Sequence, residues 1–210
     1  KIEDNVNDNF NELETGGAVT DWNVYAPKWS PVEVAEFPSV TNKSLLLEDK
    51  DPYDYARAIR VFKESQKTEI NVKVFPKQIK EGIFEIDVTD RYGNRPVRIR
   101  FDEDGKIKAV DGSREVVLQS YKSDSWYDLK IEIDAQPYGS FNVAVNGEQL
   151  LTNAKLAEAV KSVERISFRT GPYRDLPNRK TPNEDPVPPL PGADEAVKLI
   201  QFYVDDLAVK

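Results

Sequence analysis

Basic side chains gather late in a chain that is acidic as a whole. They lie in and just after a strand expected over 163–169, with Tyr173 among them, at Arg165, Arg169, Arg174, Arg179 and Lys180. Guanidinium forks suit carboxylate and sulfate groups, and a tyrosine ring offers a face for a sugar. The cluster therefore suggests a site for an acidic polysaccharide at Arg169 and on the loop that follows. The alternative is that these arginines pair with acidic residues of the same loop and hold it down.

Two carboxylates stand at alternate positions, Glu85 and Asp87, and Asp90 follows them. Alternate residues of a strand share one face, and a retaining glycoside hydrolase needs two carboxyl groups about 5–5.5 Å apart. The next expected strand presents Arg98 and Arg100 on its polar face, and a tight hairpin would bring Arg100 near Asp87. Such cross-strand pairs stabilise an exposed sheet face. They would also lower the pKa of the carboxylates, which is unfavourable for a general acid.

Of the three tryptophans, Trp29 is the candidate for sugar contact, and Tyr53, Tyr92 and Tyr138 at expected turns are similar cases. Trp29 lies in the irregular segment 26–31, where an indole can either stack on a sugar or cover the edge of the core. Trp22 and Trp126 begin expected strands, so we expect them in the core.

Composition excludes several classes of function. The 210 residues include no cysteine, histidine or methionine, and the formal net charge is -8. Without histidine and cysteine there is no Ser-His-Asp chemistry, no thiol catalysis and no metal site built on these ligands. The charge argues against nucleic-acid binding, and no apolar run approaches the roughly 20 residues of a membrane span. Because methionine is absent, we expect Lys1 to be a processed or excised terminus, as in a mature secreted protein or a domain cut from a longer chain.

The elements that must position these residues are mostly strands. Residues 127–134 and 141–145 alternate apolar and polar side chains, and Asn146-Gly147 offers a tight turn. About a dozen such strands separated by turn residues predict an all-β fold, an antiparallel β-sandwich or jelly roll. We expect a helix only over 154–160.

Two further features concern the end of the chain. The alternation over 199–209 changes parity at Asp205-Asp206, which predicts a β-bulge. The proline-rich segment 172–192 is expected to be a long surface loop, because a good strand follows it. We therefore expect one domain over residues 1–210.

The stretch from Trp126-Tyr127 through an alternating strand to Val145-Asn146-Gly147 resembles the concanavalin A-like lectin/glucanase superfamily, close to its laminin-G-like members. The Asp-Asn-Phe opening at 8–10 and the acidic closing strand are similar to those of sugar-associated members. The resemblance implies a jelly roll whose first and last strands lie side by side. It also implies a structural calcium ion held by Asp8, Asn9, Asp205 and Asp206, although these could simply be solvated turn and bulge residues.

Residues 85–90 are similar to the Glu-x-Asp-x-x-Glu strand of laminarinase-type and lichenase-type glycoside hydrolases, which share this fold. The resemblance implies that Glu85 would be a nucleophile assisted by Asp87. It departs from the pattern at Asp90, where those enzymes carry the glutamate that acts as the acid.

These observations favour a non-catalytic carbohydrate-binding or accessory domain of a secreted polysaccharide-degrading protein. Its partners would be a polysaccharide or oligosaccharide and a catalytic domain of the same or a neighbouring chain. The resemblance places it outside the cell, in the periplasm or at the cell surface. The alternatives are a glycoside hydrolase built on Glu85, Asp87 and Asp90, a polysaccharide lyase using Tyr173 with Arg169 or Arg174, and a structural module that packs on a catalytic neighbour.

Overall fold

The computed structural model describes residues 5–136, 138–171, 191–192 and 194–210. Strands of the eight-stranded sheet are β1 (Val6–Asp8), β3 (Val32–Ser39), β4 (Asn42–Asp49), β6 (Lys67–Pro76), β11 (Tyr127–Asp134), β12 (Ser140–Val145), β13 (Glu148–Lys155) and β15 (Ile200–Val209). Strands of the seven-stranded sheet are β2 (Trp22–Tyr25), β5 (Arg57–Ser65), β7 (Phe84–Thr89), β8 (Val97–Phe101), β9 (Lys106–Asp111), β10 (Arg114–Ser120) and β14 (Val163–Thr170).

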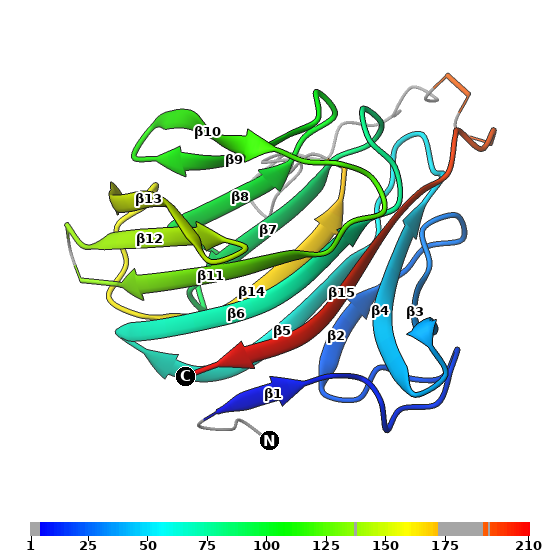
Figure 1. Cartoon of the computed structure of the whole chain (residues 1–210), viewed down its shortest axis with the longest axis horizontal. Coiled ribbons are helices and arrows are strands. Elements are labelled where there is room, and N and C mark those ends of the chain that lie inside the picture. The colour runs from blue at the N-terminus through cyan, green and yellow to red at the C-terminus, as the bar shows by residue number, and fades with distance from the viewer. Residues whose placement is uncertain (1–4, 137, 172–190, 193) are drawn as a thin grey trace, which may run out of the picture.

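The two sheets form an antiparallel sandwich (Figure 1). The first sheet runs in the order β13-β12-β11-β6-β15-β4-β3, and the second runs β10-β9-β8-β7-β14-β5-β2. Strand β1 pairs with the end of β15, so the first and last strands do lie side by side. The predicted β-sandwich of jelly-roll type is confirmed.

The core lies between the sheets and follows from the period of two along each strand. Every second residue of β11, from Tyr127 to Ile133, is buried, while Asp128, Lys130 and Glu132 are exposed. Phe84 of the seven-stranded sheet stacks on Phe202 of the eight-stranded sheet, with ring centroids 4.5 Å apart. One apolar cluster therefore joins both sheets, as a one-sided alternation requires.

Two local predictions are confirmed. Asn146 and Gly147 both adopt positive φ, at 50° and 81°, and connect β12 to β13. The pairing of β15 with β6 shifts register between Asp205 and Ala208, and Asp206 has a φ of 48°, so the predicted β-bulge is present.

The helix predicted over 154–160 is wrong. Strand β13 continues to Lys155, and Ala154 is buried opposite Phe141 of β12. The short apolar run belongs to the end of β13 and to the loop that follows it. The structure shows no helix in the part of the chain that it describes. Accordingly, no membrane-spanning helix is found among those residues.

The two tryptophans assigned to the core lie in different clusters. Trp22 is buried in the core between the sheets. Trp126 is only partly buried and packs against a smaller aromatic cluster with Phe37, Phe75 and Tyr203. Because Tyr203 alternates with the core residues of β15, this smaller cluster lies on the outer face of the eight-stranded sheet.

We expect Gly82→Ala to destabilise the fold by about 1–2 kcal/mol. Gly82 has a φ of +70°, which costs a residue with a side chain free energy, and an added Cβ would lie 2.3 Å from Cδ1 of Ile200. Chemical unfolding would measure the change. The matched control is Gly93→Ala, where φ is +87° but nothing lies within 4 Å of the added Cβ. Equal losses in the two variants would show that Ile200 makes no steric contribution.

Candidate functional site

A row of charged residues crosses the outer face of the seven-stranded sheet. Strand pairing sets Arg57 opposite Arg169, Arg169 opposite Glu85, Glu85 opposite Arg100, and Arg100 opposite Lys108. We call these five residues the charged row. They come from β5, β14, β7, β8 and β9, so the row exists only because these strands are neighbours in this order.

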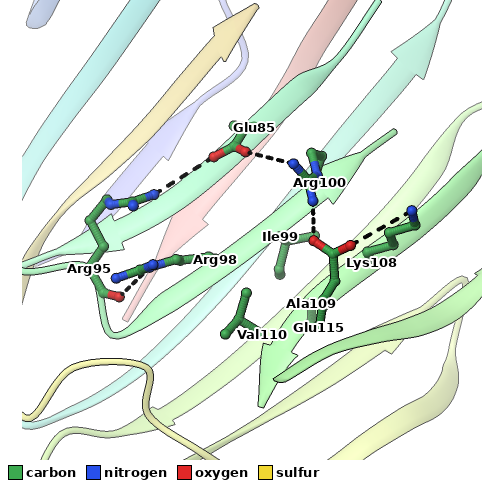
Figure 2. Close-up of a pocket in the computed structure, with 9 residues that line it drawn as sticks. All are labelled: Glu85, Arg95, Arg98, Ile99, Arg100, Lys108, Ala109, Val110 and Glu115. Carbon is green, nitrogen blue, oxygen red and sulfur yellow. Dashed lines mark hydrogen bonds and ion pairs between the residues drawn. The ribbon is translucent and has the colours of Figure 1, made fainter. Parts of the chain in front are cut away.

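One end of the row, at Glu85, Arg100 and Lys108, opens into a hollow of about 200 Å³, which we call the charged pocket (Figure 2). Its charged lining consists of Glu85, Arg95, Arg98, Arg100, Lys108 and Glu115. Figure 2 shows Glu85 between two guanidinium groups, and Glu115 between Arg100 and Lys108. The Glu85 carboxylate lies 3.8 Å from Nη1 of Arg95 and 3.6 Å from Nη1 of Arg100.

The cations of the pocket are positioned by ion pairs. Arg98 donates to the Glu158 carboxylate at 2.7 Å. The Lys108 ammonium forms ion pairs with the Asp102 and Asp104 carboxylates at 2.7 Å each, and these contacts raise the pKa of Lys108. Long side chains held in this way lose less freedom when a ligand arrives. The arrangement offers fixed donors beside fixed acceptors, which suits sugar hydroxyl groups and carboxylates.

Burial, rather than cross-strand pairing, controls the two carboxylates on β7. The pKa of Asp87 is raised to about 7 by burial and by the nearby Glu85 charge, against the opposing effect of Arg95. Burial also raises the pKa of Glu85, although Arg100 and Arg95 oppose the change. The prediction that arginine pairing would lower these pKa values is wrong, because desolvation outweighs the ion pairs.

The register of the β7–β8 hairpin also differs from the prediction. Asp87 lies opposite Arg98, and Glu85 lies opposite Arg100. The tight turn closes at Asp90, whose N–H donates to the carbonyl of Asn94. The connection between Asp87 and its partner is therefore two residues shorter than predicted, which leaves every charge on its predicted face.

Asp90 is engaged in this turn. Its carboxylate accepts hydrogen bonds from the backbone N–H groups of Tyr92 and Asn94, at 2.9 Å each, and from the Asn94 amide at 2.8 Å. Of the three carboxylates singled out in the sequence, Glu85 lines the pocket. Asp87 does not line the pocket, but Arg95 contacts both Asp87 and Glu85. Asp90 caps the turn.

An aromatic group adjoins the other end of the charged row. The Arg169 guanidinium lies 3.8 Å from the ring centroid of Tyr55, and Tyr55 is 5.2 Å from the ring of Tyr25. The Tyr25 hydroxyl donates to the Asp54 carboxylate. Tyr55 was not recognised in the sequence. The signal for it is the Tyr-Ala-Arg spacing, which sets Tyr55 and Arg57 on the same side of the chain.

The other binding residues predicted from the sequence have different positions. Arg169 belongs to the charged row, whereas Tyr173, Arg174 and Arg179 lie outside the described residues. Trp29 is half-buried in its turn beside Lys28 and does not line the charged pocket.

The residues expected to hold calcium have other contacts. The Asp8 carboxylate accepts hydrogen bonds from the Trp22 indole and the Arg60 guanidinium at 2.8 Å each. Asp206 lies 3.4 Å from the Lys73 ammonium. No group of three or more acidic side chains suited to a metal ion occurs in the described part of the chain. These residues therefore do not form a carboxylate cage, and calcium stays a prediction that would depend on carbonyl ligands.

We expect Asp8→Ala to destabilise the domain by about 1 kcal/mol, because it removes a largely buried ion pair and an indole hydrogen bond. The loss should be the same in calcium and in chelator if those two contacts account for it. Thermal unfolding of both proteins under both conditions is the measurement. A calcium-dependent gain in the unmodified protein that Asp8→Ala abolishes would instead assign Asp8 to a metal site.

The fold and the polar face define a class, the jelly-roll domains of carbohydrate-active proteins with a concanavalin A-like sandwich. Among solved structures, a sialidase matches with a TM-score of 0.88 and 26% identity, over 98% of this chain and 18% of the sialidase. An alginate lyase matches with a TM-score of 0.61 and 11% identity, over 100% of this chain and 98% of the lyase. An endo-β-1,4-glucuronan lyase from the fungus Trichoderma reesei matches with a TM-score of 0.59 and 12% identity, over 93% of each chain.

A family model for the sialidase-like carbohydrate-binding domain matches residues 22–185. The chain belongs to this family, and the resemblance seen in the sequence is confirmed at the level of the fold. The comparison with curated proteins gives no match. The chain spans less than a fifth of the sialidase that it resembles.

Proposed function

We propose that this carbohydrate-binding domain holds its saccharide on the outer face of the seven-stranded sheet and has no catalytic role. The charged pocket carries the proposal. It presents preset donors and acceptors at one end of a row whose other end carries two tyrosines. Saccharide sites need fixed polar groups for hydroxyls and an aromatic surface for the apolar face of a ring.

The charge of the pocket suggests which saccharides bind. Its lining has four cations (Arg95, Arg98, Arg100, Lys108) and two carboxylates (Glu85, Glu115), a balance of +2 in a chain of net charge -8. This local reversal of sign favours a saccharide that carries carboxylate groups over a neutral one.

The positions of the carboxylates support binding without bond cleavage. A general acid must reach the glycosidic oxygen. Glu85 is held between two guanidinium groups, Asp87 is 2% exposed, and Asp90 accepts three hydrogen bonds in its turn. None of the three combines exposure with a second carboxyl group across an open cleft.

We further propose that the domain is an accessory part of a secreted polysaccharide-degrading protein and works beside a catalytic domain. Its match to a small part of a much longer sialidase supports this arrangement. Tethering a binding domain to an enzyme raises the local concentration of the polymer at the catalytic site.

The test is a binding screen of neutral and uronic-acid polysaccharides by affinity gel electrophoresis, with product release assayed in the same samples. We expect retardation by acidic polymers, weakening at high salt, and no products. Release of reducing ends or unsaturated sugars would contradict the non-catalytic assignment. Glu85→Gln would then distinguish a hydrolase based on Glu85 from a lyase.

A further inference from the structure

A second and larger hollow lies at the end of the sandwich where β7 turns into β8. Its volume is about 480 Å³, within the range of roughly 300–1,000 Å³ that is usual for small-molecule sites. The parts of the lining that matter here are the ring of Tyr92, the apolar side chains of Ala159 and Val160, and the polar groups of Glu64, Arg91 and Ser162, which we call the rim. We call it the Tyr92 hollow.

Tyr92 is the most unusual feature of this hollow. Its side chain is 83% exposed, although Asp90 and Val160, which also line the hollow, are buried. The Asp90 carboxylate holds the Tyr92 and Asn94 backbone N–H groups, so the ring stands on a turn with a defined shape. A large ring left in water on such a support is available to cover the apolar face of a ligand.

The rim is preset in the same way. Arg91 pairs with Glu64 and lies 3.5 Å from a Glu164 carboxylate oxygen. The Ser162 hydroxyl donates to Oε1 of Glu64 at 2.9 Å. These groups come from the end of β5, the β7–β8 turn and the approach to β14, and together they offer both donors and acceptors.

The charge of this hollow differs from that of the charged pocket. Its lining holds two cations, Arg91 and Lys161, and two carboxylates, Glu64 and Asp90, so the charges balance. A balanced polar rim around an aromatic platform fits an uncharged pyranose, whose C–H face stacks on the ring while its hydroxyls reach the rim.

We infer that the Tyr92 hollow is a second saccharide-binding site, which takes a neutral pyranose unit. The inference rests on the proposed function only for the ligand class. Arg95 of the charged pocket and Tyr92 belong to the same connection between β7 and β8, so the two sites share this connection. A polymer that engages both sites is bound more tightly than a fragment that fills one.

The test uses the ¹⁵N-labelled full chain, titrated with hexasaccharides of glucan, xylan and galactan and with hexagalacturonate. We expect the backbone amides of Tyr92 and Ser162 to shift with a neutral hexasaccharide. Tyr92→Ala should weaken that binding at least 10-fold, while Tyr92→Phe should stay within about 3-fold, because the ring rather than its hydroxyl forms the platform. The control is Tyr138→Ala, which removes a fully exposed tyrosine from another turn and should change nothing.

The outcomes separate the two sites. Shifts at Arg100 without shifts at Tyr92 would overturn the second site and leave the charged pocket standing. Shifts at Tyr92 without shifts at Arg100 under any saccharide would support the second site and count against the charged pocket. An unchanged affinity in Tyr92→Ala would overturn the inference even if nearby amides shift.

Discussion

Replacing Arg100 with alanine is expected to weaken saccharide binding at least 30-fold, the largest functional effect that the structure predicts. Arg100 lies at the centre of the charged pocket and contacts Glu85, Asp102 and Glu115. Its removal deletes the fork that would hold a ligand carboxylate, and it leaves Glu85 and Glu115 to repel that carboxylate. Central charged anchors of this kind contribute roughly 2–4 kcal/mol to binding, which corresponds to a loss of 30-fold or more.

Isothermal titration calorimetry with the best acidic oligosaccharide of the screen would measure this loss. Arg100→Lys keeps the charge without the fork, so an intermediate affinity is expected. Lys130→Ala removes an exposed cation of the eight-stranded sheet, which pairs with Glu69 of the same sheet, and should leave binding unchanged. If Arg100→Ala folds normally and binds as tightly as the parent, the saccharide does not use the charged pocket.

Replacing Asp87 with asparagine is expected to stabilise the domain by roughly 1–3 kcal/mol at pH 8.5 and by roughly a third of that at pH 5. The folded-state pKa of Asp87 is about 7, whereas the ordinary value is 3.8. Between these values the folded chain holds a proton that the unfolded chain has released. The free energy of unfolding therefore falls as the pH rises from about 3.8 to about 7, and the contribution of Asp87 no longer changes above that range.

Asparagine has nearly the same shape and no charge, so it removes the cost of burying a carboxylate at high pH. The contact with Arg95 at 3.5 Å offsets part of this gain, because the carboxylate that pairs with that arginine is lost. The Oδ1 atom of Asp87 accepts no hydrogen bond from the described residues, which fits a group that carries a proton near neutrality.

Guanidinium chloride unfolding at several pH values between 5 and 9 would test this prediction. The difference between variant and parent isolates Asp87 from the other buried carboxylates. Asp128→Asn, which alters an exposed residue of β11, should change stability by less than about 0.5 kcal/mol at every pH. A variant that is less stable than the parent at pH 8.5 would show that Asp87 works as an ionised structural partner of Arg95.

The sequence by itself determined the fold class and most of the strands. The alternation of apolar and polar residues can be read locally, and a sheet with one buried face requires it. The inward side chains of residues 127–134 and 141–145 are therefore predicted correctly. The positive φ of Asn146-Gly147 and the bulge at Asp205-Asp206 are equally local. The helix prediction for residues 154–160 failed because a short apolar run fits either a helix or a strand. Only the pairing of Ala154 with Phe141 decides between them.

The proposed binding face depends on the tertiary structure. Glu85, Asp87 and Arg100 could be recognised in the sequence because they lie on one hairpin, although their register and pKa values could not. Strand order alone brings Arg57 and Arg169 beside them, from positions more than one hundred residues apart in the chain. The reversal of the expected pKa shifts has the same origin, because desolvation depends on everything packed around a carboxylate, whereas the sequence shows only its neighbours along the strand.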